Sequence, residues 1–387
     1  IMDLVINHCS DQHEWFQKSR RRIEPYTDYY IWRKGEKGKK PTNWGNFFGG
    51  DCWEYDDLRE EYYLHLFAKE QPDLNYHNEA VIEAIEEAMH FWLERGVAGF
   101  RCDVINIIYK EAIKNGKWRP ALTGSEYYLS TPGCHRVLHR LHEDVLAKYD
   151  AFTVGETVFV TPKMADDLVN PARGELSTVF AFEHMETDCY KIKWFLRRFS
   201  PDRFFACLTK WQKALPWNTV YLENHDQPRS VSRFGNDTQY HDESAKALAT
   251  LVLTLRGTPF LYEGQEIGMT NFDFSDMEKV QDVESINIWN MGKQLHLPYS
   301  LRWRMIKTKS RDNARTPMQW NDSPNAGFTT GTPWLSVNGN YPRINVAEQE
   351  NAPNSVLAYY RQLIAFRNGS EILQAGDFSE LYRKDGV

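Results

Sequence analysis

The sequence lacks the features that would place it at once in several protein classes. It has no run of 18 apolar residues, which excludes an ordinary transmembrane helix. It has no GxGxxG turn and no phosphate-binding loop, the marks of nucleotide-binding sheets. The formal net charge is −7, and this acidic balance favours neither nucleic acid nor an anionic membrane as a partner. No fixed-period repeat or low-complexity tract is present.

Cysteine is scarce and unpaired in the sequence. The six cysteines lie far apart, and none forms a CxxC motif. This spacing predicts free thiols in a reducing compartment rather than a disulfide framework, and therefore a cytoplasmic protein. No signal peptide is visible, but the chain begins at Ile1 inside an apolar strand pattern. We therefore expect a natural N-terminus upstream of this residue.

One apolar strand carries two charges where packing alone would not place them. The segment 99–106 reads GFRCDVIN and follows a helix pattern that begins after Asn78 and ends before Gly96. Residues i and i+2 of a strand share a face, so Arg101 and Asp103 point the same way. Paired charges at the carboxyl end of a buried strand are typical of active sites in parallel α/β folds.

Five further segments repeat this pattern of an apolar strand that ends in polar residues and precedes a helix. The five segments are 2–11, 149–157, 176–184, 218–229 and 257–268, and 99–106 is the sixth. The pattern predicts a (β/α)8 barrel with its functional groups at the strand ends. An open doubly wound sheet is the alternative.

The spacing of the strands predicts three parts. The 70 positions from His8 to Asn78 exceed an ordinary connection and indicate an inserted subdomain at 9–75. The barrel then comprises 1–8 and 76–373. Residues 374–387 are predicted to start a C-terminal β-domain.

Three strand ends supply carboxylates that only a fold could gather: Asp103, Glu156 and Asp226. Glycoside hydrolysis with retention needs a carboxylate nucleophile and a carboxylic acid that protonates the leaving oxygen. Arg101 would keep Asp103 ionised, whereas Glu156 must hold a proton near neutral pH. A single strand-end Asp is more often a helix cap, and Arg101 with Asp103 could be a core ion pair. The prediction rests on the whole set.

Seven short motifs resemble the α-amylase family of glycoside hydrolases, in order and in spacing. They are DLVINH, GFRCDVIN, VGET, LENHDQPR, QPDLN, GTPFLYEGQEIGM and DNARTPMQW. The chain is similar throughout to the oligo-1,6-glucosidase and dextran glucosidase subgroup. Sucrose isomerases, trehalose-6-phosphate hydrolases and maltases are close relatives of that subgroup.

The resemblance implies a role for each matching residue. Asp103 would be the nucleophile, Glu156 the acid/base and Asp226 the transition-state stabiliser. His8, Arg101 and His225 would bind the terminal glucose, and the rest of the pocket wall would be formed by Phe48, Phe67, Gln71 and Arg315. Val104 would mark preference for α-1,6 linkages, where α-1,4-acting relatives carry Thr. Its alternative role is that of a core-filling strand residue.

The chain departs from the family pattern at its ends. It starts at what resembles the third barrel strand, so the first two β/α units are expected in a natural chain longer by roughly 90–100 residues. With them would come an Asp and a Tyr that close the glucose pocket, and a loop that often holds calcium or magnesium. No cofactor and no metal ligand are predicted within this sequence.

The predicted activity is that of a retaining α-glucosidase acting on isomalto-oligosaccharides, as a monomer or weak homo-oligomer. A sucrose isomerase, transglucosylase or α-1,4-glucosidase would share the same triad. A trehalose-6-phosphate hydrolase would need a basic phosphate site, for which RKGEKGKK at 33–40 is a candidate, although a solvated loop fits it better. A non-enzymatic transporter subunit of this fold would lack parts of the catalytic set.

Overall fold

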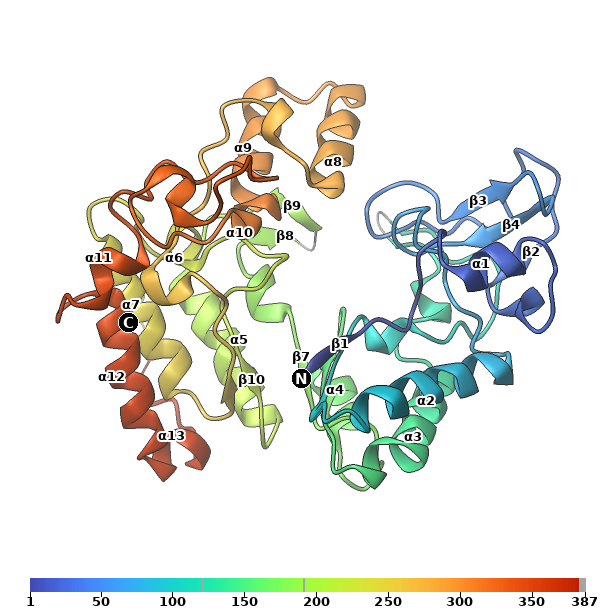
Figure 1. The fold of residues 1–387 in the computed structure, drawn as a ribbon, viewed down its shortest axis with the longest axis horizontal. Helices are drawn as coiled ribbons and strands as arrows, with labels where there is room; N and C mark the ends of the chain where they lie inside the picture. The colour runs from blue at the N-terminus through green and yellow to red at the C-terminus, as the bar shows by residue number, and fades with distance from the viewer. Residues whose placement is uncertain (120–121, 191, 383–387) are drawn as a thin grey trace. The chain divides into compact units, whose positions relative to one another are not determined.

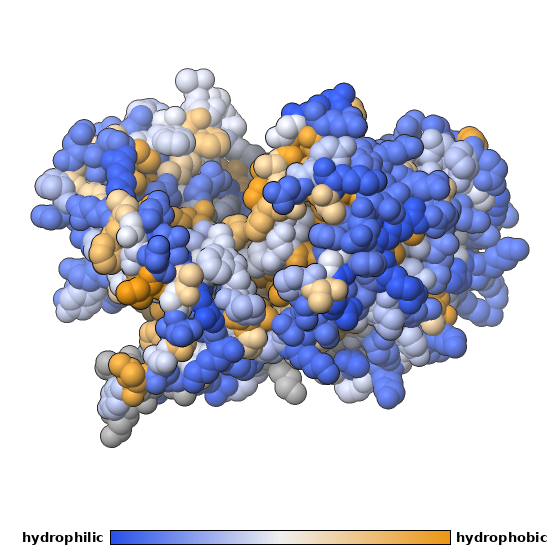
Figure 2. All heavy atoms as spheres, turned by 90° about the horizontal axis from the view of Figure 1, so that it is seen from below, coloured by the Kyte–Doolittle hydropathy of each residue, from blue (hydrophilic) through white to orange (hydrophobic). Residues whose placement is uncertain are grey.

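The computed structural model describes residues 1–119, 122–190 and 192–382. It divides into two compact units, residues 1–182 and 183–387, and each is described by itself. Figure 1 shows their helices and strands. Hydrophilic residues cover most of the face seen in Figure 2, with hydrophobic residues showing between them.

The first unit is built on a parallel sheet. Its strands are β1 (Met2–Leu4), β5 (Gly99–Cys102), β6 (Phe152–Glu156) and β7 (Thr178–Phe180), in the spatial order β1-β5-β6-β7. Their order in space follows their order in the chain, as in a barrel wall. A Cβ on Gly99 would meet the Phe152 carbonyl oxygen at 1.9 Å. The pairing of β5 with β6 therefore depends on a glycine at this position.

The helix predicted between Asn78 and Gly96 begins and ends with the expected caps. In α2 (Glu79–Leu93) the side chain of Asn78 accepts a hydrogen bond from the Ala80 amide, and the left-handed Gly96 follows the helix. Helix α3 (Pro132–Asp144) and helix α4 (Pro162–Val169) each start with a threonine cap followed by proline. Helix α2 lies beside α3 (Figure 1).

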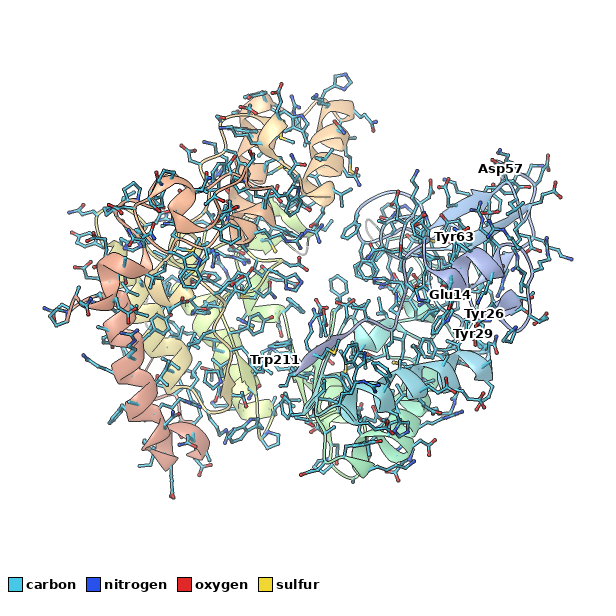
Figure 3. The ribbon with its side chains drawn as sticks, in the orientation of Figure 1. Glu14, Tyr26, Tyr29, Asp57, Tyr63 and Trp211 are labelled. Atoms are coloured by element: carbon cyan, nitrogen blue, oxygen red, sulfur yellow. The ribbon has the colours of Figure 1, made fainter. Side chains whose placement is uncertain are left out.

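Between β1 and α2 the chain forms a small antiparallel sheet. It contains β2 (Trp32–Arg33), β3 (Trp53–Asp56) and β4 (Glu61–Leu64), in the order β2-β4-β3, and α1 (Glu14–Ser19) precedes it. Tyr26 and Tyr29, labelled in Figure 3, are the first residue and the C-cap of the short 3-10 helix that follows α1. Their ring centroids are 4.9 Å apart, one of many aromatic contacts in this segment.

The second unit contains the remaining two predicted strands. β10 (Thr219–Val220) and β11 (Thr258–Pro259) pair in parallel, and β8 (Cys189–Tyr190) pairs with β9 (Ile192–Leu196) in antiparallel fashion. The helices are α5 (Pro201–Ala214), α6 (Ser230–Phe234), α7 (His241–Thr254), α8 (Val283–Gln294), α9 (Tyr299–Lys309), α10 (Asp312–Arg315), α11 (Val346–Glu350), α12 (Val356–Asn368) and α13 (Glu371–Ala375).

All six predicted strands are present, and each is shorter than the apolar run that predicted it. The helices α12 and α13 follow one another closely, with Gly369 as the C-cap of α12 and Ser370 as the N-cap of α13. Residues 376–382 contain no strand, and 383–387 lie outside the described residues. The predicted domain boundaries, including a C-terminal β-domain, stay predictions.

Candidate active site

Two of the three predicted catalytic carboxylates follow neighbouring strands. Asp103 comes directly after β5, and its amide donates to the Leu4 carbonyl of β1 at 3.0 Å. Glu156 is the last residue of β6, which pairs with β5 through Cys102 and Gly155. Parallel pairing therefore brings the two strand ends, and the two side chains, to the same edge of the sheet.

Arg101 joins these carboxylates. Its Nη1 donates to Asp103 Oδ1 at 2.6 Å, and its Nη2 donates to Glu156 Oε2 at 2.6 Å. The sequence predicts the first contact but not the second. Both carboxylates therefore share one positively charged partner. Asp3 of β1 also accepts from Arg101 Nη1, at 2.9 Å.

The residue after the predicted nucleophile has an unusual backbone conformation. Val104 lies in the left-handed region, with φ 37° and ψ 40°, which a β-branched residue rarely adopts. Such strained residues concentrate at functional sites. The turn directs the Val104 amide to Glu156 Oε2 at 3.2 Å, while its side chain is buried in an aromatic-rich core with Trp44 and Tyr128.

The predicted sugar-binding residues of the first unit lie in contact with one another. The ring centroid of His8 is 5.1 Å from that of Phe67, and that of Phe48 is 5.7 Å from Phe67. Gln71 Nε2 lies 2.9 Å from His8 Nε2. The sequence analysis missed Phe47, which stacks on Phe67 at 4.8 Å. Its only signal was the adjacent FF pair.

His8 is a largely buried imidazole. Burial lowers its pKa, and the nearby carboxylates of Asp73 and Asp103 oppose that effect without cancelling it. The balance favours the neutral ring near pH 7. A neutral ring offers one hydrogen-bond donor and one acceptor, which suits a hydroxyl-rich ligand.

The third predicted carboxylate lies in the second unit, after β10. Asp226 Oδ1 accepts from Arg315 and lies 3.5 Å from Arg311 Nη1, and His225 Nε2 is 3.6 Å from Oδ2. Burial opposes ionisation of Asp226, but His225, Arg311 and Arg315 outweigh it and hold its pKa below the ordinary range. His225 and Arg315 are predicted residues, whereas Arg311 was missed.

A second carboxylate, Asp282, holds Arg311 in position. Its Nε donates to Asp282 Oδ1 at 2.8 Å, and Asp282 in turn caps α8 through the amides of Glu284 and Ser285. The signal for Arg311 was its position at the start of the RDNARTP segment, four residues before Arg315. In the described helix that spacing puts both guanidinium groups on the side of Asp226.

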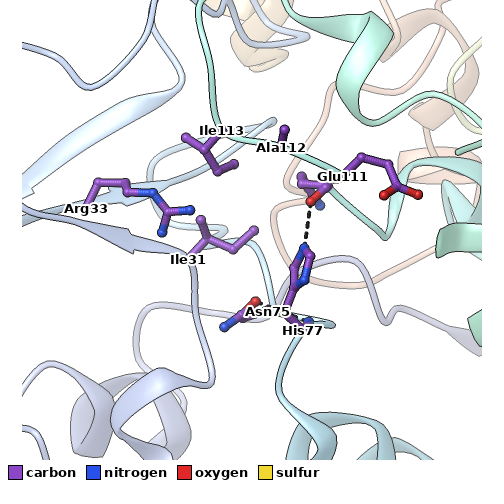
Figure 4. Close-up of a pocket in the computed structure, with 8 residues that line it drawn as sticks. Ile31, Arg33, Asn75, His77, Glu111, Ala112 and Ile113 are labelled. Atoms are coloured by element: carbon purple, nitrogen blue, oxygen red, sulfur yellow. Dashed lines mark hydrogen bonds between the residues drawn. The ribbon is translucent and has the colours of Figure 1, made fainter.

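A cavity of about 270 Å³ lies elsewhere in the first unit (Figure 4). His77 is one of its lining residues, and its Nε2 lies 2.8 Å from the Lys110 carbonyl oxygen. None of the predicted site residues lines it; the lining residues are Ile31, Arg33, Asn75, His77, Lys110, Glu111, Ala112 and Ile113. Of the basic segment 33–40, only Arg33 reaches this cavity.

Three further features concern residues 1–119, 122–190 and 192–382 as a whole. All six cysteines lie there, and all are free thiols. No described helix is long and apolar enough to cross a membrane. No group of three or more His, Cys, Asp or Glu side chains in this part of the chain is arranged to hold a metal ion.

Comparisons with known proteins give consistent likenesses. Residues 1–376 match the model of the alpha amylase catalytic domain. The chain is 48% identical to an oligo-1,6-glucosidase of Parageobacillus thermoglucosidasius, over all of this chain and 70% of that protein. It is 42% identical to the trehalose-6-phosphate hydrolase of Bacillus subtilis, over all of this chain and 69% of that protein.

Among solved structures, the isomaltulose synthase of Klebsiella sp. LX3 superposes with a TM-score of 0.96 at 38% identity. That superposition covers all of this chain and 71% of the other.

Proposed function

The chain belongs to the α-amylase family of glycoside hydrolases, and from this premise we propose that it releases terminal α-1,6-linked glucose from isomalto-oligosaccharides. The family membership confirms the predicted fold class, the TIM-barrel glycoside hydrolase fold. Oligo-1,6-glucosidases of three bacilli, at 46–48% identity, support the linkage. The observation that carries the mechanism is the single guanidinium of Arg101 between Asp103 and Glu156.

In the first proposed step, Asp103 attacks the anomeric carbon while Glu156 gives its proton to the glycosidic oxygen. The bond between that carbon and oxygen breaks, and a glucosyl ester of Asp103 forms. Negative charge thus leaves Asp103 and appears on Glu156. Arg101 contacts both groups, and the Val104 amide adds a second donor on Glu156. The stabilisation can follow the charge without movement of the arginine.

In the second step, Glu156 takes a proton from water, whose oxygen attacks the anomeric carbon and releases Asp103 with overall retention. Asp226, held ionised by its arginines, would stabilise the positive charge on the ring in both steps. His8, Phe67 and Gln71 would contact the terminal glucose. No organic cofactor takes part in this scheme.

A second candidate is isomerisation or transfer, in which a sugar replaces water in the second step. The observation that supports this reaction is the TM-score of 0.96 to the isomaltulose synthase. The triad chemistry is common to both reactions, so the acceptor alone distinguishes them.

One hydrolysis panel tests the proposal. Isomaltose, maltose, sucrose, trehalose-6-phosphate and dextran are incubated with the protein, and products are separated by chromatography. We expect glucose from isomaltose at the highest kcat/KM, with Asp103→Asn as the inactive matched control. Isomaltulose from sucrose as the main product would establish the isomerase, and preferred cleavage of trehalose-6-phosphate would establish the phosphate-sugar hydrolase.

Two finer features belong to the same proposal. The free thiols fit a reducing compartment, and we infer that the protein acts in the cytoplasm. Its partner is the oligosaccharide itself, and we infer a monomer or weak homo-oligomer. Sedimentation velocity at several concentrations tests the second point.

A further inference from the structure

A buried lysine lies behind the predicted sugar-binding histidine. Lys110 is 2% exposed, and its ammonium contacts three oxygens. These are Asp73 Oδ2 at 2.6 Å, Asn7 Oδ1 at 2.7 Å and the Ile108 carbonyl at 3.3 Å. The contacts with Asn7 and Ile108 are hydrogen bonds, and the contact with Asp73 is an ion pair; an ammonium has donors only and can accept from none of them. Burial lowers the pKa of Lys110, and Asp73 opposes that effect.

Lys110 determines which way the amide of Asn7 faces. Since the ammonium can only donate, Asn7 must present its oxygen to it. The Asn7 NH₂ group is then left on the other side, 3.2 Å from His8 Nδ1. Asn7 is itself fully buried, so water does not compete for either end of the amide. A reversed amide would place NH₂ against the ammonium.

The orientation of Asn7 decides where His8 carries its proton. Nδ1 faces an N–H donor and must accept, so it bears no hydrogen. A neutral imidazole then carries its hydrogen on Nε2, and an imidazolium, with hydrogen on both nitrogens, is disfavoured. Nε2 faces the side-chain NH₂ group of Gln71 at 2.9 Å, because the Gln71 oxygen accepts from the Ala68 amide at 3.2 Å. The Nε2 hydrogen therefore needs an acceptor oxygen, which a ligand can supply, or Gln71 itself after a half-turn of its amide that gives up the Ala68 contact.

We propose that Lys110 and Asn7 are positioning residues that hold His8 as the Nε2-protonated tautomer, so that it offers a hydrogen-bond donor to a sugar oxygen. The last clause rests on the proposed function, because it needs His8 to bind the glucosyl unit. The tautomer itself rests only on Lys110, Asn7 and His8. The ammonium thus acts on His8 through two hydrogen bonds, and on the ligand through a third.

Nitrogen NMR of protein labelled with ¹⁵N-histidine reads the tautomer directly, without any sugar present. The His8 signals are those that vanish in His8→Gln. We expect an unprotonated Nδ1 and a protonated Nε2 in the unsubstituted protein at pH 7. A protonated Nδ1, or a pair of averaged signals from rapid exchange, would overturn the proposal.

The substitution Asn7→Asp should change which nitrogen of His8 carries the hydrogen. A carboxylate keeps its contact with Lys110 but also presents an oxygen to Nδ1, so Nδ1 should become protonated. The matched control is Asn75→Asp, which adds the same charge in the same unit at a side chain that contacts the Asp28 carbonyl and not His8. We expect the Nδ1 signal to move in Asn7→Asp alone. An Nδ1 signal that stays in place in Asn7→Asp would contradict the claim that Asn7 sets the tautomer of His8.

Activity provides the second readout. With Nε2 no longer a donor, kcat/KM on isomaltose should fall by about tenfold, the value of one lost hydrogen bond. A changed Nδ1 signal with unchanged kcat/KM would overturn the claim that His8 donates a hydrogen bond to the sugar. Failure of the hydrolysis panel with the expected spectrum would instead reject the proposed substrate and leave the tautomer standing.

Discussion

The backbone amide of Val104 donates a hydrogen bond to Glu156 Oε2, 3.2 Å away. The residue next to the proposed nucleophile thus contacts the proposed acid/base through its main chain. This contact needs the left-handed turn at Val104, because that turn points the amide at the end of β6 instead of along β5. The two proposed catalytic carboxylates are therefore coupled both by Arg101 and by the peptide that joins Asp103 to Val104.

Glu156→Gln tests the acid/base role. The variant keeps an oxygen for Arg101 and Val104 but has no proton to give. Cleavage of isomaltose should fall by about 10²–10⁴-fold, the usual contribution of general acid catalysis. Aryl glucosides with good leaving groups should retain the first step, which is visible as a burst of the phenol. Isomaltose turnover at the unsubstituted rate would show that Glu156 is not the acid.

Val104→Thr tests the linkage preference. A hydroxyl could hydrogen-bond a differently placed acceptor ring, so the maltose-to-isomaltose ratio of kcat/KM should rise, by no more than about 10–200-fold. The side chain is only 5% exposed and packs in the core with Trp44, which favours the smaller end of that range. Val104→Ala is the matched control without a hydroxyl. An equal change of the ratio in both variants would leave Val104 with a packing role.

The strands and the first unit's site were predictable because they depend on short-range pattern. Alternating apolar residues located β5 and β6, and strand pairing then dictated that Asp103 and Glu156 share an edge. The contact of Arg101 with Glu156 was not predictable, because it depends on which two strands pair and on a long side chain's reach across them. The prediction used Arg101 only beside its neighbour in sequence.

Other acidic residues after strands show why the strand-end pattern alone predicts too many catalytic carboxylates. Glu223 follows β10 like a catalytic group, yet it is fully buried against Arg229 at 3.1 Å and accepts from the Ser230 amide at the start of α6. It is a structural carboxylate. Arg311 was missed for the converse reason, since its partners Asp226 and Asp282 are remote from it in sequence.

Arg311→Gln should move the pH profile. Arg311 helps to hold the pKa of Asp226 below its ordinary range, so losing it raises that pKa. Asp226 must be ionised to stabilise the ring's positive charge, and the acid limb of kcat/KM should therefore shift to higher pH. Arg311→Lys, which keeps the charge, should restore most of the profile. Arg361→Gln removes an exposed arginine of the same unit and should change nothing. An acid limb that stays in place would separate Arg311 from Asp226.

Asp188→Asn should destabilise the second unit, because it leaves two buried cations without their carboxylate partner. Asp188 Oδ1 pairs with Arg233 at 2.8 Å and Oδ2 with Lys309 at 2.7 Å, and the lysine and arginine side chains are 1% and 2% exposed. Removing one partner of a buried ionic group typically destabilises by about 3–5 kcal/mol, because the remaining charges stay unpaired. Arg233 also donates to Gln227 beside Asp226, so activity should fall with stability.

The pH dependence of this loss has a definite sign. Burial would raise the pKa of Asp188, but Arg233 and Lys309 outweigh it and lower the pKa to about 2. A carboxyl group with a depressed folded pKa stabilises the fold above its unfolded pKa, about 3.9, and loses that contribution as pH falls through 2. Urea unfolding should therefore show a large deficit for Asp188→Asn at pH 7 that shrinks toward pH 2. Asp273→Asn, which breaks an exposed pair with Lys307, is the control and should unfold like the unsubstituted protein at both pH values. A deficit of the same size at pH 7 and near pH 2 would show that packing, and not the charge of Asp188, is what the substitution removes.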